Sequence, residues 1–216
     1  MGSCYTAAVG ISKYLSERLK TLRIFNIKIQ ATVASEGSAF YLSNDMRDSI
    51  IVVLAQSGTT IDTNIFAKMA QERGAYTISI VNKRDGDITY IVENNLYLGN
   101  GRDVELSVPS TKTYTAHLFL GFIFSDKIIS YIKKKSKSEI FKTSKKIIKS
   151  NFINNILNKQ FKATNKINFD ILNYVKWVVV YDDSSNSYNC LEFRIKLSEC
   201  CYKSILYLHV DEFKKY

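Results

Sequence analysis

The chain has 216 residues, 46% of them hydrophobic and 23% charged, which is typical of a folded globular protein and excludes a largely disordered chain. It contains no apolar run of about 20 residues, the length that a membrane-spanning helix needs, so we expect no membrane partner. The formal net charge of +10 is concentrated in one lysine-rich stretch.

The first part of the chain has the periodicity of alternating helices and strands. Apolar residues recur at helical spacing early on, and short β-branched runs follow. A glycine stands where the second long helix should end. In that helix, Ile61, Ile65, Met69 and Ala70 are expected to form one buried stripe. The expected elements are a helix over 5–22, a strand over 27–33, a short helix or loop over 38–46, a strand over 50–54 and a helix over 62–72.

The turn between the second strand and its helix has the composition of an anion site. Gly58 allows close backbone approach, and Ser57, Thr59 and Thr60 add hydroxyl donors. Free N–H groups at a helix start, together with the helix dipole, favour negative charge. A phosphate monoester fits this chemistry. The alternative is a helix cap and a tight turn without a ligand, and the local residues favour neither.

The same alternation continues to residue 132 and predicts the fold class. We expect a strand over 75–81, a helical turn over 88–92, a strand over 95–98, a polar loop over 99–109 and a helix over 110–132. Strands that alternate with helices indicate an α/β, doubly wound parallel sheet with helices on both faces. Such sheets bind ligands beyond the carboxyl ends of their strands, where the Ser57 turn lies.

A lysine-rich segment separates this unit from a second one. Its lysines alternate with apolar residues such as Ile140, Phe141 and Ile147, which predicts a connecting helix with a solvated basic face. It lacks the arginines and paired aromatic residues of base readout, so no nucleic-acid partner is expected. A buried strand over 177–180, a polar turn over 182–187 and a helix with Leu191, Ile195, Ser198 and Glu199 begin a second α/β unit.

The four cysteines lack the paired spacing of a zinc site, and only two histidines could supplement them. We therefore expect reduced thiols in a cytoplasmic protein, with no metal and no other cofactor. These residues are Cys4, Cys190, Cys200, Cys201, His117 and His209.

Three segments together resemble the isomerase region of the isomerising glutamine–fructose-6-phosphate aminotransferases (glucosamine-6-phosphate synthases), a tandem of sugar isomerase (SIS) domains with a flavodoxin-like, three-layer α/β/α fold. Each segment is similar to a family motif, and they occur in one consistent order. The segments are Gly2-Ser3-Cys4-Tyr5, similar to a Gly-Thr-Ser-Tyr turn; Gln56-Ser57-Gly58-Thr59-Thr60, similar to a phosphate loop; and Val108-Pro109-Ser110-Thr111-Lys112, similar to a Val-Ala-Ser-Thr-Lys segment over the sugar.

The resemblance implies roles for individual residues. Gln56, Ser57 and Thr60 would hold the phosphate, helped by Ser3 or Cys4, while Val108 and Ser110 would contact the sugar. In the second unit Glu199 would remove a proton between C1 and C2, and Lys196 would stabilise the oxyanion. Positions i and i+3 share a helix face, so this pair can point into one site. The alternative is an exposed helical ion pair.

The sequence also departs from the family. Ala55 replaces the serine that opens the phosphate loop, and Cys4 replaces a hydroxyl of the first turn. Lys215 stands where the family has its ring-opening histidine, and His209 is not the equivalent. The family's amidotransferase domain and C-terminal loop have no counterpart here, and no strand precedes the first helix. We therefore expect a piece or truncated relative of a longer enzyme.

The resemblance predicts a phosphosugar-binding protein related to the conversion of fructose 6-phosphate to glucosamine 6-phosphate in amino sugar biosynthesis. The alternative is a non-catalytic phosphosugar-binding or regulatory SIS module, so whether the chain is an enzyme is open. Expected partners are a sugar phosphate, fructose 6-phosphate or glucosamine 6-phosphate, and a second copy in a homodimer. The expected domains are a first SIS domain over 1–132 that lacks its first strand, a connector over 133–170 and an incomplete second SIS domain over 171–216.

Overall fold

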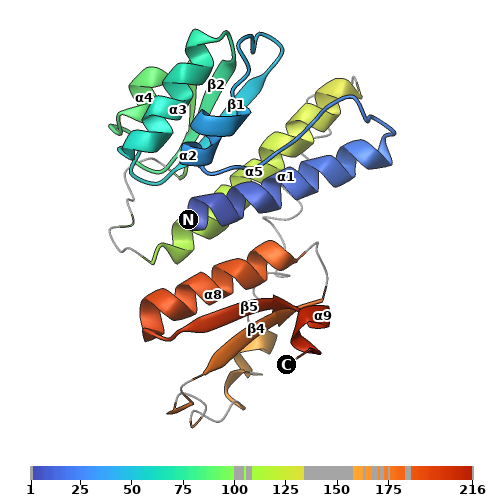
Figure 1. Ribbon diagram of the computed structural model, residues 1–216, viewed down its shortest axis with the longest axis vertical. Coiled ribbons are helices and arrows are strands. Elements are labelled where there is room, and N and C mark those ends of the chain that lie inside the picture. The colour runs from blue at the N-terminus through green and yellow to red at the C-terminus, as the bar shows by residue number, and fades with distance from the viewer. Residues whose placement is uncertain are drawn as a thin grey trace.

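The computed structural model describes residues 2–99, 105, 109–133, 158–162, 164–166, 170, 173–174, 176–182 and 186–215. Its first sheet contains β1 (Ile50–Ala55), β2 (Tyr76–Val81) and β3 (Asn94–Tyr97), parallel and in the order β1-β2-β3 (Figure 1). Ala55 pairs with Val81, and Val81 pairs with Tyr97. The carboxyl ends of the three strands therefore meet at one edge of the sheet.

Helices cover both faces of this sheet (Figure 1). On one face lie α3 (Ile61–Glu72) and α4 (Ile88–Ile91); on the other lie α1 (Ser3–Thr21) and α5 (Thr111–Ile132). The short α2 (Ala34–Glu36) and the π-helix η1 (Gly37–Tyr41) pack beside α3. The core between β1, β2, α3 and α4 contains Val53, Ala55, Ala67, Val81, Ile88 and Val92. The predicted three-layer α/β/α class is confirmed.

The contact between α1 and α5 depends on small residues. A Cβ atom at Gly121 would lie 2.2 Å from Ile11 Cδ1, so only glycine allows this separation of the two helices. The Tyr14 ring lies 4.6 Å from Phe122, and the Tyr14 hydroxyl donates to Asp126 at 2.9 Å. The buried face of α5 is polar or small at most of its positions, which are Thr113, His117, Gly121, Ser125 and Ile129.

A second parallel sheet follows, with β4 (Trp177–Tyr181) paired to β5 (Ile205–His209). Between them runs α8 (Ser187–Cys201), and α9 (Val210–Phe213) follows β5. In Figure 1, α8 lies between its own sheet and α1. A Cβ at Gly10 of α1 would meet the Tyr188 ring at 2.7 Å, and Lys13 Nζ donates to Ser187 Oγ at 2.6 Å. The second unit thus packs on the first through α8.

Three sequence predictions about the elements are wrong. No strand forms over 27–33, because this alternating segment pairs with no neighbouring strand and leaves Ile27 exposed. The expected stripe on α3 also fails, since Ile61 is 73% and Ile65 48% exposed, and the helix instead packs on the sheet through Ala67 and Ala70. The strand over 177–180 is not buried on both faces, because only one face meets α8.

The remaining predicted helices and strands are confirmed within a few residues. Most of the expected connector over 133–170 and most of the loop over 99–109 lie outside the described residues, and the domain boundaries stay predictions. No helix in the described part of the chain is long and apolar enough to cross a membrane.

Candidate functional site

The turn between β1 and α3 has an open end that faces solvent. Gly58 adopts a left-handed backbone with φ +72°, which lets its carbonyl accept from Ile88 N at 2.9 Å. The Ser57 hydroxyl lies 2.9 Å from that of Thr59 and accepts from Thr59 N at 3.3 Å. Thr59 and Thr60 are exposed, and Thr60 stands at the N-cap of α3 without a side-chain capping bond. Hydroxyls and the start of a helix therefore face one region of solvent, as an anion site requires.

The first turn of α1 lies against this loop. The pKa of the Cys4 thiol is raised to about 11, chiefly by burial; the Gln56 backbone lowers it, Glu192 raises it and Lys196 lowers it. Cys4 therefore lies among groups from α1, the loop after β1 and α8. Its thiol is neutral at physiological pH and acts as a small, weak donor rather than a nucleophile.

Helix α8 brings a lysine and two carboxylates to the same place. Lys196 Nζ lies 2.9 Å from Glu199 Oε2 and 3.3 Å from Glu192 Oε1. The exposed fractions of the side chains are 14% for Lys196, 30% for Glu199 and 6% for Glu192, so this is not an exposed helical ion pair. Burial lowers the pKa of Lys196, but the two carboxylates raise it by more, so the ammonium stays charged.

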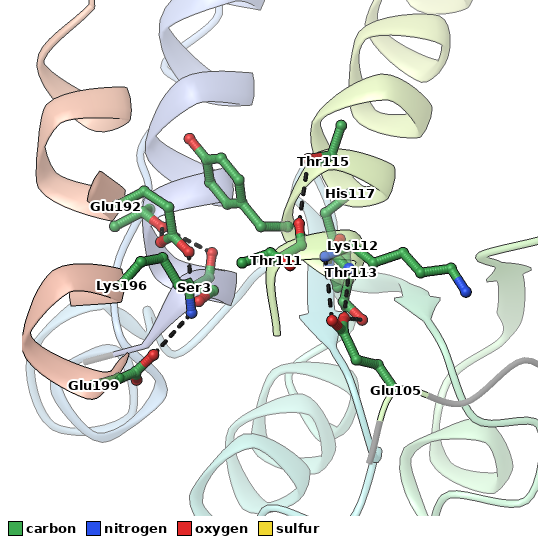
Figure 2. Close-up of polar contacts among 12 residues, drawn as sticks. Ser3, Glu105, Thr111, Lys112, Thr113, Thr115, His117, Glu192, Lys196 and Glu199 are labelled. Carbon is green, nitrogen blue, oxygen red and sulfur yellow. Dashed lines mark hydrogen bonds and ion pairs between the residues drawn. The ribbon is translucent and has the colours of Figure 1, made fainter. Parts of the chain in front are cut away.

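Contacts between α1 and α8 fix this cluster in place. The Thr6 hydroxyl contacts Glu192 Oε2 at 2.5 Å and the Ser3 carbonyl at 2.9 Å. Figure 2 shows Glu192, Lys196 and Glu199 on the side of α8 that faces the first turn of α1, where Ser3 lies. Glu192 therefore connects the lysine of the second unit to the first unit.

A carboxylate side chain, that of Glu105, binds the start of α5. The Glu105 carboxylate accepts from Thr113 N and Thr113 Oγ1, each at 2.8 Å, and from Lys112 N at 3.3 Å (Figure 2). Burial raises the pKa of Glu105, but these bonds lower it by more. The Gln56 amide donates to the Glu105 carbonyl. Glu105 therefore occupies the N-terminus of α5.

The structure thus brings together most of the residues that the sequence singled out. Ser3, Cys4, Gln56 and Lys196 lie close together, with Glu199 bound to Lys196. Gln56 contacts Glu105 through its amide, and Ser110 is buried at the N-cap of α5. Val108 lies outside the described residues.

Sequence reasoning gave no role to several residues that shape the site. They are Thr6, Glu105, Tyr114, His117 and Glu192. A signal existed for Glu192, because it stands at i−4 from Lys196 on the same helix face. Tyr114 Oη donates to Asn189 at 2.9 Å, and burial beside Glu192 raises the pKa of this tyrosine.

Among the described residues, no group of three or more His, Cys, Asp or Glu side chains could hold a metal ion. A surface hollow of about 450 Å³ lined by Asp45, Arg47 and Asp48 lies before the start of β1, at the opposite end of the strands, and Asp45 neutralises Arg47 there at 2.6 Å.

Comparison with known proteins relates the chain to one domain family. Residues 19–124 match the model of the SIS domain. The chain contains a SIS domain. Residues of the chain are 33% identical over 120 positions to the isomerising glutamine–fructose-6-phosphate aminotransferase of Pyrococcus horikoshii, covering 55% of this chain and 18% of that protein. For the enzyme of the same name from Helicobacter pylori the identity is 31% over 156 positions, covering 72% and 24%.

Solved structures extend the likeness to both units. The C-terminal domain of glucosamine-fructose-6-phosphate aminotransferase from Francisella tularensis superposes with a TM-score of 0.80 at 19% identity, over 99% of this chain and 58% of that one. Glucosamine-6-phosphate deaminase from Thermotoga maritima gives 0.75 at 18% identity, over 100% and 60%. At these identities the structures support the fold alone. The chain spans only part of each relative, about a fifth of the aminotransferases.

Proposed function

We propose that this SIS protein binds a sugar phosphate, with the phosphoryl group at Ser57–Thr60 and the carbon chain extending toward Lys196 and Glu199. One observation carries the proposal: the first turn of α1, the loop after β1 and the charged face of α8 meet around Cys4. Three segments remote in sequence supply an anion site and, beside it, a buried cation with two carboxylates.

The anion half of the site can bind a phosphoryl group through neutral donors. Hydroxyls of Ser57, Thr59 and Thr60 and the N-terminus of the 12-residue α3 provide hydrogen bonds and a favourable dipole. The second helix start in this region, that of α5, is filled by Glu105. A single phosphoryl group at α3 therefore fits better than two anions.

The α8 half suits proton transfer between adjacent carbons of an open-chain sugar. A carboxylate base, Glu199, can take a proton from one of the two carbons C1 and C2 and return it to the other. The Lys196 ammonium can stabilise the oxygen of the enediolate that forms between these two steps. Glu192, bonded to Thr6 and paired with Lys196, keeps the ammonium next to Glu199. This supports an aldose–ketose isomerisation, the chemistry implied by the resemblance to the aminotransferases.

A thermal-shift experiment tests binding. Fructose 6-phosphate or glucosamine 6-phosphate at about 100 times its Kd should stabilise the fold by about 2.7 kcal/mol, a rise in Tm of roughly 5–10 °C. Unphosphorylated fructose should give no shift. Ser57→Ala and Thr60→Ala should reduce the shift, while Thr21→Ala, an exposed threonine at the end of α1, should keep it. Equal shifts in all variants would show that the phosphoryl site lies elsewhere.

Catalysis separates the two functions that the resemblance allows. A wild-type chain that interconverts aldose and ketose phosphates should lose turnover in Glu199→Gln, with binding retained. A wild type that binds without turnover supports the non-catalytic alternative, which Ala55 in place of a loop hydroxyl also favours. Light scattering with and without ligand measures the expected homodimer.

A further inference from the structure

His117 is a fully buried histidine that contacts backbone carbonyls of three different elements. Its Nδ1 lies 3.0 Å from the carbonyl of Thr113 on α5, and its Nε2 lies 3.0 Å from that of Ile80 on β2. The backbone of Ala55, the last residue of β1, is a third hydrogen-bonding partner. Ala55 directly precedes Gln56, so the imidazole lies under the start of the phosphate loop.

The hydrogen-bond partners of His117 suit an imidazolium, although burial of the ring favours the neutral form. A neutral imidazole has one N–H, so one of its nitrogens presents a lone pair to a carbonyl oxygen only 3.0 Å away. A protonated ring donates from both nitrogens. Burial lowers the pKa of His117, and the carbonyls of Ile80, Thr113 and Ala55 act in the opposite direction. Burial thus keeps the ring neutral, while its hydrogen-bond partners would accept it as a cation.

The phosphate loop itself offers no positive side chain to a dianion. Residues 56–62 contain no lysine or arginine and end in Asp62. Two nearby cations are paired with carboxylates: Lys196 with Glu192 and Glu199, and Lys83 with Asp85 at 3.5 Å. A bound phosphoryl dianion would therefore add negative charge to a region that already holds several carboxylates.

We propose that His117 takes up a proton when a dianion binds at Ser57–Thr60, so that the affinity of the loop for dianions rises as the pH falls. This inference rests on the proposed phosphoryl site. His117 is a positioning residue: it acts through the backbone of Ala55 and through its charge, without touching the ligand. By linkage, the bound dianion raises the pKa of His117 by the same free energy.

Other titratable groups lie on the elements around His117. Strand β1 has none, and β2 has only Tyr76, at the opposite end from Ile80. On α5, His117 is the one ionisable side chain among the buried positions, and the Glu105 carboxylate accepts from Thr113 at the start of this helix. On α1, which packs on α5, the titratable groups are Cys4, Tyr5, Lys13, Tyr14, Glu17, Arg18 and Lys20, and the thiol of Cys4 is neutral because its pKa is about 11.

The test uses inorganic sulfate, because a phosphate monoester itself changes charge near pH 6. Calorimetry measures sulfate affinity and proton uptake for the wild type, His117→Gln and His209→Gln between about pH 5.5 and pH 8. Glutamine at 117 has two amide protons and can donate to both Ile80 and Ala55 without titrating. His209 is the second of the two histidines in the sequence and serves as the matched control.

The wild type should bind sulfate more tightly at the lowest pH than at the highest. The affinity should change by about tenfold for each pH unit by which bound sulfate raises the pKa of His117. It should also take up protons on binding. His209→Gln should behave like the wild type, and His117→Gln should bind with less than about a twofold pH dependence beyond that of other groups. Equal pH slopes in the wild type and His117→Gln overturn the inference.

A second measurement covers the case in which His117→Gln does not fold. With only two histidines, NMR titration of the imidazole signals, assigned with His209→Gln, gives the pKa of His117 with and without sulfate. An unchanged pKa overturns the inference and leaves the phosphoryl site standing. A wild type that binds neither sulfate nor a sugar phosphate at any pH overturns the proposed function, and this inference with it.

Discussion

Replacing Lys196 by methionine tests whether the α8 cluster is a coupled, buried unit. Methionine keeps most of the apolar stem and removes the ammonium. Glu192, with a side chain only 6% exposed, would then keep Thr6 as a donor but lose its counter-charge. Removing one partner of a buried ion pair costs about 3–5 kcal/mol. Because water reaches Glu199, we expect the lower end, about 3 kcal/mol at neutral pH.

The loss should appear as a fall in Tm of roughly 6–12 °C for a protein of this size. Urea unfolding followed by the fluorescence of Trp177, the only tryptophan, gives the free energy directly, since this residue lies in β4 beside α8. Replacing Glu192 by glutamine in the Lys196→Met background should restore at least about 1 kcal/mol, because the unpaired charge is gone.

Strictly additive losses for Lys196→Met and Glu192→Gln would refute the coupling and reduce the cluster to independent surface charges. The exposed pair of Arg47 and Asp45, which lie 2.6 Å apart with side chains 81% and 58% exposed, is the matched control. Because solvent screens this pair, Arg47→Met should leave the urea midpoint close to that of the wild type.

Three further outcomes follow from local geometry. Gly58→Ala should cost about 1–3 kcal/mol and weaken ligand binding, because φ is +72° and the new Cβ would meet a side-chain atom at 2.9 Å; Gly99→Ala, with φ +62° and nothing within 4 Å, should cost less in the same unfolding assay. Glu105→Gln should lose about 0.5 kcal/mol at neutral pH. The folded pKa of Glu105 lies below 4.5, so its stabilisation is complete above that pH and disappears as the pH falls through the folded value; the variant's stability should vary less with pH there. In mass-spectrometric alkylation, Cys4 should react more slowly than the exposed Cys200, and an equal rate would contradict its raised pKa.

Local signals in the sequence were sufficient to predict most strands, turns and helices of the first sheet. The β-branched run before Ala55, the break at Gly58 and the glycine after Arg73 each correspond to one physical preference, and the strand, turn and helix ends follow them. The resemblance then connected Lys196 and Glu199 with a loop about 140 residues away, which no periodicity could have done.

The wrong predictions concern features that depend on contacts with residues distant in the sequence. Ile27 alternates as in a strand but has no strand beside it, and Ile61 lies on the solvent side because Ala67 and Ala70 allow α3 closer to the sheet. The buried roles of Glu192 and His117 depend on helices that meet only in the folded chain. The spacing of Glu192 from Lys196 indicates a shared helix face, but nothing in the sequence indicates that this face will be enclosed.

The hydrogen bond between Thr6 and Glu192 joins residues 186 positions apart in the chain. Contacts of such long range form late, since the intervening chain must first be ordered. On the ribosome, the first sheet and its loop would emerge and fold well before α8 is made. A ligand that needs both halves of the proposed site therefore could not assist the early steps of folding, because the two halves meet only after α8 has docked on α1.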